Sequence, residues 1–83
     1  MKEKEIGEIS AYFTHVGAAA VKLSGKLKIG DKVHIKGHTT DFEQKVDSMQ
    51  VEKEKVGQAK KGDHIGIKVN EKVRPNDKVF LVE

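Results

Sequence analysis

The chain has 83 residues, a formal net charge of +3 and no cysteine. This length predicts one domain, and the lack of cysteine excludes disulfides and thiolate metal sites, as expected for a cytoplasmic protein. Residues 1–5 are charged and no apolar stretch follows them, so we expect a charged tail rather than a signal peptide or a membrane anchor.

The first part of the chain predicts two strands joined by a turn. Residues 6–13 alternate, which places Phe13 on the face of the preceding apolar side chains and leaves Tyr12 exposed. Gly17 suits a turn or a bulge. Residues 18–23 have helix propensity, but the run is short and has no helix cap, so we interpret it as a strand whose alanines face a tight interior.

The rest of the chain alternates strands with polar connections. Leu27 and Ile29 are expected to be buried beneath a lysine-bearing connection. Residues 42–51 form the longest predicted strand, with a bulge near residues 47–48 where the apolar alternation shifts. Residues 52–61 are polar and indicate a loop or a single helical turn. The other predicted strands, which bring the total to about six, are residues 32–36, 64–69 and 78–82.

A turn motif occurs three times in the chain. Residues 29–35, 61–67 and 75–81 each contain a Gly or Asn, then an Asp, then an alternating apolar run. Gly and Asn tolerate positive φ, and the Asp carboxylate can accept backbone N–H groups that the turn leaves unpaired. Each segment therefore predicts a tight turn followed by a half-buried strand. Repeated in so short a chain, the motif favours a small, closed all-β domain that spans residues 1–83.

Two families resemble this sequence. Residues 24–37 (SGKLKIGDKVHIKG), 46–50 and 56–69 are similar to the second domain of translation GTPases such as elongation factor Tu and initiation factor two. Residues 39–46 are similar to the C-terminal domain of collagenase-like peptidases. The resemblance implies a stand-alone elongation-factor-like protein of the translation-protein type. Its fold would be an antiparallel β-barrel of six to seven strands that contacts ribosomal RNA or tRNA.

The chain also departs from the translation GTPases. It has no Gly-x-x-x-x-Gly-Lys-Ser/Thr loop, so we expect no nucleotide-hydrolysis site. Ala20 and Val21 occupy the place where elongation factor Tu has a Gly-Arg pair, and His64 falls where that family has an Asn near the aminoacyl pocket. A dedicated carrier of aminoacylated tRNA is therefore disfavoured, whereas general contact with RNA requires only well-placed cations.

Lysine supplies nearly all of the positive charge, and Arg74 is the single arginine. Lysines can hold a nucleic-acid backbone but read base sequence poorly. The alternative is that they only keep a small domain soluble. Tyr12 is included among the candidates because exposed aromatic rings stack on bases. The candidate RNA-binding residues are Tyr12, Lys22, Lys26, Lys28, Lys32, His34, Lys36, His38, Lys60, Lys61 and His64.

Metal binding and catalysis receive little support from the sequence. His34 and His38 are four residues apart, but a strand that enters a turn does not bring them together, and we expect no carboxylate to complete a site. Ser10, Ser24 and Ser48 have no neighbouring base in the sequence. We therefore predict a protein without a metal, a cofactor or enzymatic activity.

Two hypotheses for function follow. In the first, the domain is a translation module that binds RNA or the ribosome through its lysine-rich face. In the second, it is a protein-interaction module that docks on a separate partner, such as a collagenase-like peptidase or a GTPase. Neither hypothesis involves a membrane.

Overall fold

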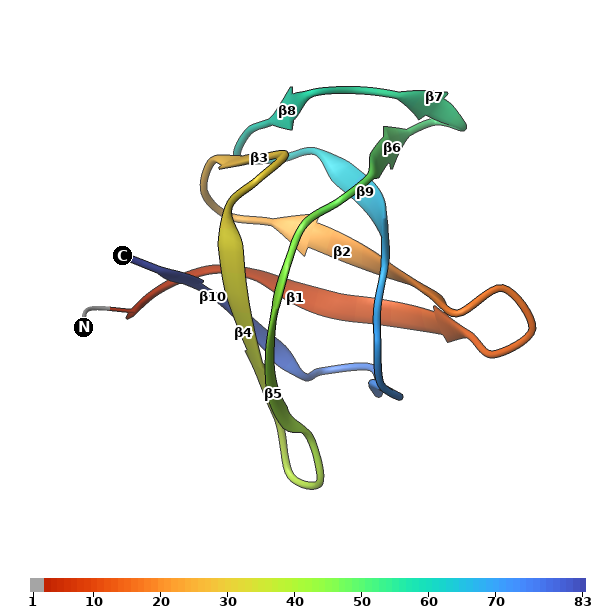
Figure 1. Ribbon diagram of the computed structural model, residues 1–83, viewed down its shortest axis with the longest axis vertical. Coiled ribbons are helices and arrows are strands. Elements are labelled where there is room, and N and C mark those ends of the chain that lie inside the picture. The colour runs from red at the N-terminus through yellow and green to blue at the C-terminus, as the bar shows by residue number, and fades with distance from the viewer. Residues whose placement is uncertain (1–2) are drawn as a thin grey trace.

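The computed structural model describes residues 3–83, and every regular element in this range is a β-strand. The predicted all-β class is therefore confirmed, and the alanine-rich segment is a strand rather than a helix. Over the described range, the structure has no helix of the length and apolarity needed to cross a membrane. The strands are β1 (Glu3–Phe13), β2 (Ala18–Leu23), β3 (Leu27–Lys28), β4 (Lys32–Lys36), β5 (Asp41–Lys45), β6 (Met49–Val51), β7 (Glu54–Lys55), β8 (Gln58–Ala59), β9 (His64–Lys68) and β10 (Lys78–Val82) (Figure 1).

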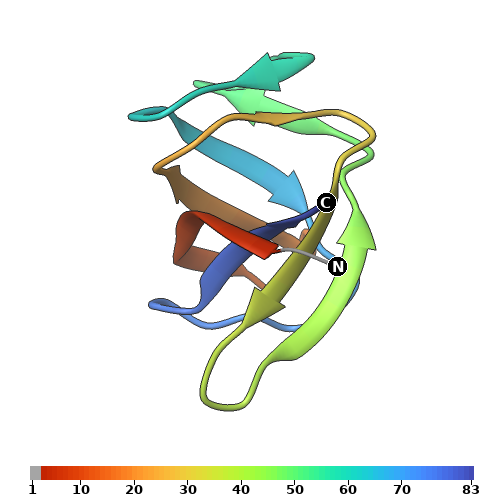
Figure 2. The same ribbon diagram turned by 90° about the vertical axis from the view of Figure 1, so that its left-hand side faces the viewer.

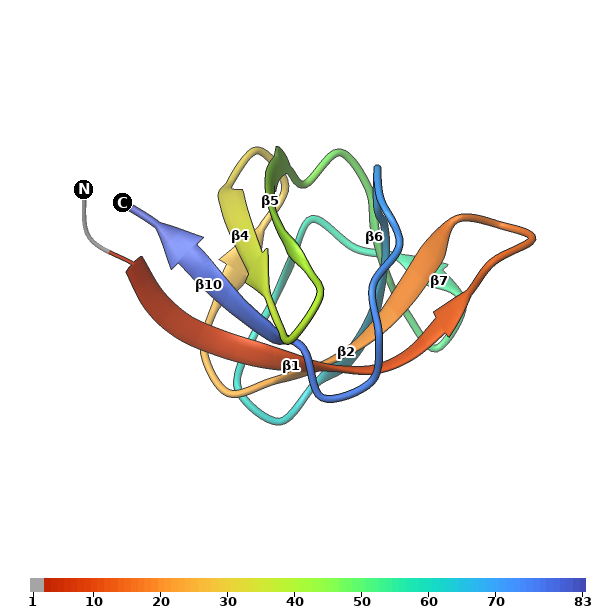
Figure 3. The same cartoon turned by 90° about the horizontal axis from the view of Figure 1, so that it is seen from below.

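Eight of these strands form one antiparallel sheet in the order β5-β4-β10-β1-β2-β9-β6-β7. The sheet is strongly curved, with β1 and β2 at its middle and its two arms bending toward each other (Figure 3). The short strands β3 and β8 pair separately and lie at one end of the domain (Figure 2). Strand β1 begins at Glu3, within the segment that we expected to be a charged tail, while Met1 and Lys2 lie outside the described residues.

The two arms of the sheet meet at a seam that a side chain bridges. Within residues 3–83, β5 pairs with β4 alone, so the predicted closed barrel is not confirmed. Instead, the buried Gln44 side chain of β5 reaches the end of β9. Its Nε2 donates to the Lys68 carbonyl at 2.7 Å, and its Oε1 accepts from the Asn70 N–H at 2.8 Å. One amide therefore satisfies two backbone groups where a strand ladder would otherwise be needed.

The three predicted turns share one hydrogen-bonding pattern. Their φ angles are positive, at 94° for Gly30, 94° for Gly62 and 77° for Asn76. In each turn the Asp carboxylate accepts a backbone N–H from three residues earlier, as the sequence predicted; the donors are Lys28, Lys60 and Arg74. The backbone of each turn also donates one hydrogen bond to, and accepts one from, the backbone of a single residue in another segment. This residue is Val46 for the first turn, Leu23 for the second and Ile9 for the third. The motif therefore fixes each turn locally and also connects it to a distant part of the chain.

The apolar side chains that follow each Asp point into the core. Val33, Ile35, Ile65 and Ile67 are each 2% exposed or less, as predicted. They pack with apolar side chains from both arms of the curved sheet, so one core holds the arms together. Ile29, which precedes the Asp of the first motif, is 40% exposed where we predicted burial.

A β-bulge in β1 reverses the predicted exposure of its aromatic residues. The pairing with β2 runs from Ile9 to Val21 and then from Ala11 to Ala20, so Ser10 is an extra residue. One extra residue moves all the following side chains to the opposite face. Tyr12 consequently packs against the core, whereas Phe13 is 46% exposed. The prediction of a buried Phe13 and an exposed Tyr12 was therefore wrong.

The predicted long strand at residues 42–51 is two strands, β5 and β6, with an irregular segment between them. Both Val46 and Met49 are buried, and the two intervening residues are exposed. The predicted shift in the apolar alternation is therefore present, at the predicted place. This shift interrupts the strand instead of forming a β-bulge within it.

Candidate functional site

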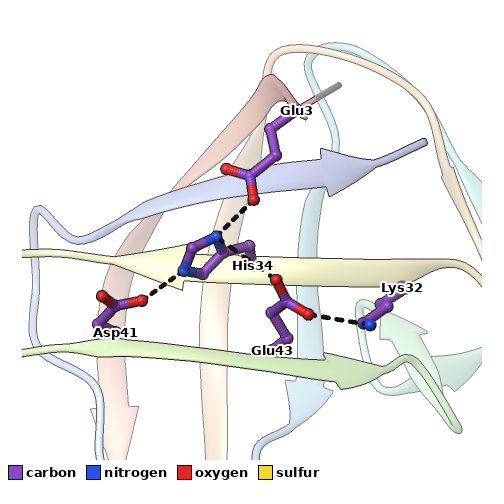
Figure 4. Close-up of polar contacts among 5 residues, drawn as sticks. All are labelled: Glu3, Lys32, His34, Asp41 and Glu43. Atoms are coloured by element: carbon purple, nitrogen blue, oxygen red, sulfur yellow. Dashed lines mark hydrogen bonds and ion pairs between the residues drawn. The ribbon is translucent and has the colours of Figure 1, made fainter. Parts of the chain in front are cut away.

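The outward face of β4 carries Lys32, His34 and Lys36, as the alternation predicted. His34 is nevertheless surrounded by carboxylates (Figure 4). Its Nδ1 lies 2.6 Å from Oε2 of Glu3, and its Nε2 lies 2.5 Å from Oδ1 of Asp41. Because a carboxylate faces each ring nitrogen, both nitrogens can donate only when the ring is protonated.

The charges on this face neutralise one another. The hydrogen bond to Asp41, and then the one to Glu3, raises the pKa of His34, while the hydrogen bond from His34 lowers the pKa of Asp41. Lys32 Nζ lies 2.9 Å from Oε1 of Glu43, and this contact lowers the pKa of Glu43. The face is therefore a mixed charge cluster rather than a free cationic surface.

We call Glu3, Lys32, His34, Asp41 and Glu43 the β4 charge cluster. It corrects the expectation that no carboxylate accompanies His34. No pattern in the sequence pointed to Glu3, because it lies 31 positions from His34 and reaches it only through the fold. Glu43 could have been found from the β4–β5 hairpin, since it is the direct cross-strand neighbour of His34.

Three of the predicted lysines line a groove along the paired strands β3 and β8. Lys26, Lys28 and Lys60 line it, together with the apolar side chains of Leu27 and Ala59, and its volume is about 740 Å³. The carboxylates of two turn motifs also border the groove, but each already accepts a backbone N–H. The two Gly-Asp turns therefore lie at one end of the domain. We call this feature the lysine groove.

The other candidates are dispersed. Lys22 and His64 are exposed cross-strand neighbours on β2 and β9. His38 is exposed in the β4–β5 turn, and Lys61 is exposed in the turn before β9. Tyr12 is partly buried against the core. The eleven predicted residues therefore form several separate groups, of which the lysine groove brings together three.

The sequence did not reveal an apolar surface at the β1–β2 hairpin, which projects from the body of the domain (Figure 1). Phe13 is 46% exposed and Val16 is 57% exposed. A hollow of about 400 Å³ lies beside Val16, and its lining combines Ala18, Gly66 and Ile67 with the polar residues Ser48, Gln50 and Lys68. We call Phe13, Val16, Ala18, Gly66 and Lys68 the hairpin surface. It was missed because the bulge at Ser10 places Phe13 outside rather than inside.

Comparisons with known proteins match nearly the whole chain. It is 41% identical over 80 residues to an uncharacterized protease of Methanocaldococcus jannaschii, an alignment that covers 95% of this chain and 20% of the protease. It is 43% identical over 77 residues to a collagenase of Porphyromonas gingivalis, covering 90% of this chain and 21% of the collagenase. The chain therefore spans about a fifth of the length of these curated relatives. No protein-family model matches it.

A solved structure has the same fold. The C-terminal domain of a U32 peptidase from Geobacillus thermoleovorans superposes with a TM-score of 0.91 at 19% identity, covering 96% of this chain and 93% of that domain. Together with the sequence relatives, this finding overturns the predicted translation, ribosome and elongation-factor role. The collagenase-like part of the resemblance is confirmed. The chain is thus similar in sequence to a fifth of a protease and of a collagenase, and it has the fold of a U32 peptidase C-terminal domain.

Proposed function

We propose that the chain is a non-catalytic β module of a collagenase-like peptidase and that it docks on the remaining part of such a protein. The observation that carries this proposal is the coverage of the alignment. The chain matches the Methanocaldococcus jannaschii protease along 95% of its own length but only 20% of the protease. We place the catalytic residues in the part of the relatives that this chain does not match.

The polar groups of the described residues support a non-catalytic role. Ser10 Oγ donates to the Ala20 carbonyl, and no serine in residues 3–83 is hydrogen-bonded to a histidine. The imidazole of His34 has a carboxylate at each nitrogen, so neither nitrogen is placed to activate a hydroxyl nucleophile. This arrangement favours binding over bond cleavage.

The hairpin surface is the docking site that we propose. Phe13 and Val16 are exposed apolar side chains on a projecting hairpin, and the hollow beside Val16 could receive a side chain of the partner. Adjacent exposed apolar groups of this kind typically mark protein–protein contacts, and aromatic residues often dominate their energetics. The partner of this surface would be the remaining four-fifths of a collagenase-like peptidase.

A binding experiment tests this proposal. The chain is immobilised, and the Porphyromonas gingivalis collagenase lacking its 77 matching residues is the soluble partner, with its folding checked by circular dichroism. We expect saturable binding that a Phe13→Ser, Val16→Ser double variant weakens at least tenfold. Ile29→Ser is the matched control, because Ile29 is another exposed large apolar residue but lies outside the hairpin surface.

Two results would overturn the docking proposal. One is a folded collagenase fragment that does not bind the chain at any accessible concentration. The other is equal weakening by the hairpin variant and by Ile29→Ser, because a docking contact at the hairpin requires the two variants to differ.

The lysine groove supports a second candidate function, the binding of an RNA backbone. Lys26, Lys28 and Lys60 line one groove, which brings three cationic residues together, and cations of this kind bind phosphate backbones. A Lys28→Glu, Lys60→Glu double variant should abolish salt-sensitive binding of a single-stranded RNA in a gel-shift titration. Lys36→Glu is the control, because Lys36 lies on β4, outside the groove. Equal RNA binding by the wild type and the double variant would refute this second function.

A further inference from the structure

We propose that Glu3, His34 and Glu43 form a binding site for a divalent transition-metal ion such as Zn²⁺. These residues come from three different strands, β1, β4 and β5. Their candidate ligand atoms all lie within 4.8 Å of one another. In Figure 4 dashed lines join Nδ1 of the imidazole to the carboxylates of both Glu3 and Glu43.

The spacing of these atoms fits a small cation. His34 Nδ1 lies 2.6 Å from Oε2 of Glu3 and 3.9 Å from Oε2 of Glu43. Zinc–ligand bonds of about 2.0–2.2 Å imply ligand atoms about 3.3 Å apart around a tetrahedral ion. The contact to Glu3 is therefore slightly shorter than this spacing, and the contact to Glu43 is slightly longer. Shifts of less than about 1 Å bring both His34 contacts to this spacing, and the two Glu ligand atoms, which lie within 4.8 Å of each other, need to approach by at most about 1.5 Å. Both movements are within the reach of a flexible Glu side chain.

Asp41 supports the imidazole on its other side. Histidines that bind metals usually direct the second ring nitrogen at a carboxylate or a carbonyl, which fixes the tautomer and the ring orientation. Asp41 Oδ1 occupies this position, 2.5 Å from Nε2. His34 is also held rigidly, because β4 is paired with β10 on one side and with β5 on the other.

The exposure of the three side chains and their ligand types favour a transition metal. Lys32 Nζ contacts Oε1 of Glu43, so Oε2 of the same carboxylate remains directed toward His34. The His34 side chain is 14% exposed, whereas those of Glu3 and Glu43 are 29% and 33% exposed. A water molecule could therefore supply a fourth ligand. An imidazole nitrogen in the ligand set favours Zn²⁺ over Mg²⁺ or Ca²⁺, which prefer oxygen ligands alone.

Calorimetric titration of the chelator-treated chain with Zn²⁺ tests the proposal. We expect one ion to bind per chain, and Mg²⁺ at the same concentration to give no binding. Glu43→Gln and His34→Gln should each weaken Zn²⁺ binding at least tenfold, and Asp41→Asn about 10–100-fold. His64→Gln is the matched control, because His64 is an exposed strand histidine outside the β4 charge cluster.

The variants also define the results that would overturn the site. Glu43 is partly exposed, so Glu43→Gln should remain folded even if His34→Gln does not. Unchanged Zn²⁺ affinity in Glu43→Gln would refute the proposal. Loss of Zn²⁺ binding in His64→Gln, or failure of the wild type to bind Zn²⁺, would refute it equally.

Discussion

Replacing Gln44 with alanine tests how the two arms of the curved sheet are held together. The Gln44 side chain is the link between β5 and the end of β9, because its amide bonds both the Lys68 carbonyl and the Asn70 N–H. Gln44 is only 7% exposed, so water cannot readily replace these bonds. The substitution leaves two backbone groups at the seam without their partner.

The expected loss of stability follows from these two groups. Each buried donor or acceptor left unpaired costs about 1–3 kcal/mol. Partial entry of water at the seam reduces this cost, so we expect Gln44→Ala to lower the free energy of unfolding by about 2–4 kcal/mol. Since 1 kcal/mol shifts Tm by about 4–8 °C in a domain of this size, Tm should fall by at least about 8 °C.

Urea unfolding followed by far-ultraviolet circular dichroism measures this change. The matched control is Gln50→Ala, because Gln50 is an exposed glutamine on β6, and its loss should change stability by less than about 0.5 kcal/mol. If Gln44→Ala is as stable as Gln50→Ala, the side-chain bridge does not stabilise the seam, and our explanation of how β5 is joined to the end of β9 is wrong.

Two further predictions concern stability. In chelator-treated protein, the raised pKa of His34 predicts that the stability of the wild type relative to His34→Gln is greatest below about pH 6.5 and declines as the pH rises through the folded-state value. Urea titrations across this range measure the difference, and a wild-type advantage that grows with pH would contradict the assigned contacts. Gly37→Ala should cost about 1–3 kcal/mol, because the added methyl group would overlap the Asp77 carboxylate, whereas Gly57→Ala, with open space around it, should cost far less. Equal unfolding midpoints for these two variants would show that the Asp77 carboxylate does not fill the space beside Gly37.

Local sequence signals predicted most of the strands. The Gly-Asp and Asn-Asp turns and the burial of Val33 and Ile65 depend on residues that are close in the chain, so spacing alone identified them. The bulge at Ser10 was not predicted, because Ser10 itself fits the alternating pattern and only the pairing with β2 shows that it is an extra residue.

The candidate sites were less predictable because they depend on strand order. The β4 charge cluster joins Glu3 to His34 across 31 positions, and the Gln44 bridge spans 24 positions to Lys68. The lysine groove was partly predictable, because Lys28 and Lys60 each directly precede a copy of the turn motif and donate a backbone N–H to its Asp. The exposure of Phe13, on which the docking proposal depends, could not be inferred without the bulge.

Hydrogen exchange of the chain with and without the truncated Porphyromonas gingivalis collagenase tests the docking proposal most directly. The amides of Val16 and Gly17 bond only to the Phe13 carbonyl within the hairpin, so partner contact should slow their exchange measurably. We predict that protection is centred on residues 13–18. Protection confined to the lysine groove or to the outer face of β4, or no protection at saturating partner, would contradict docking through the hairpin surface.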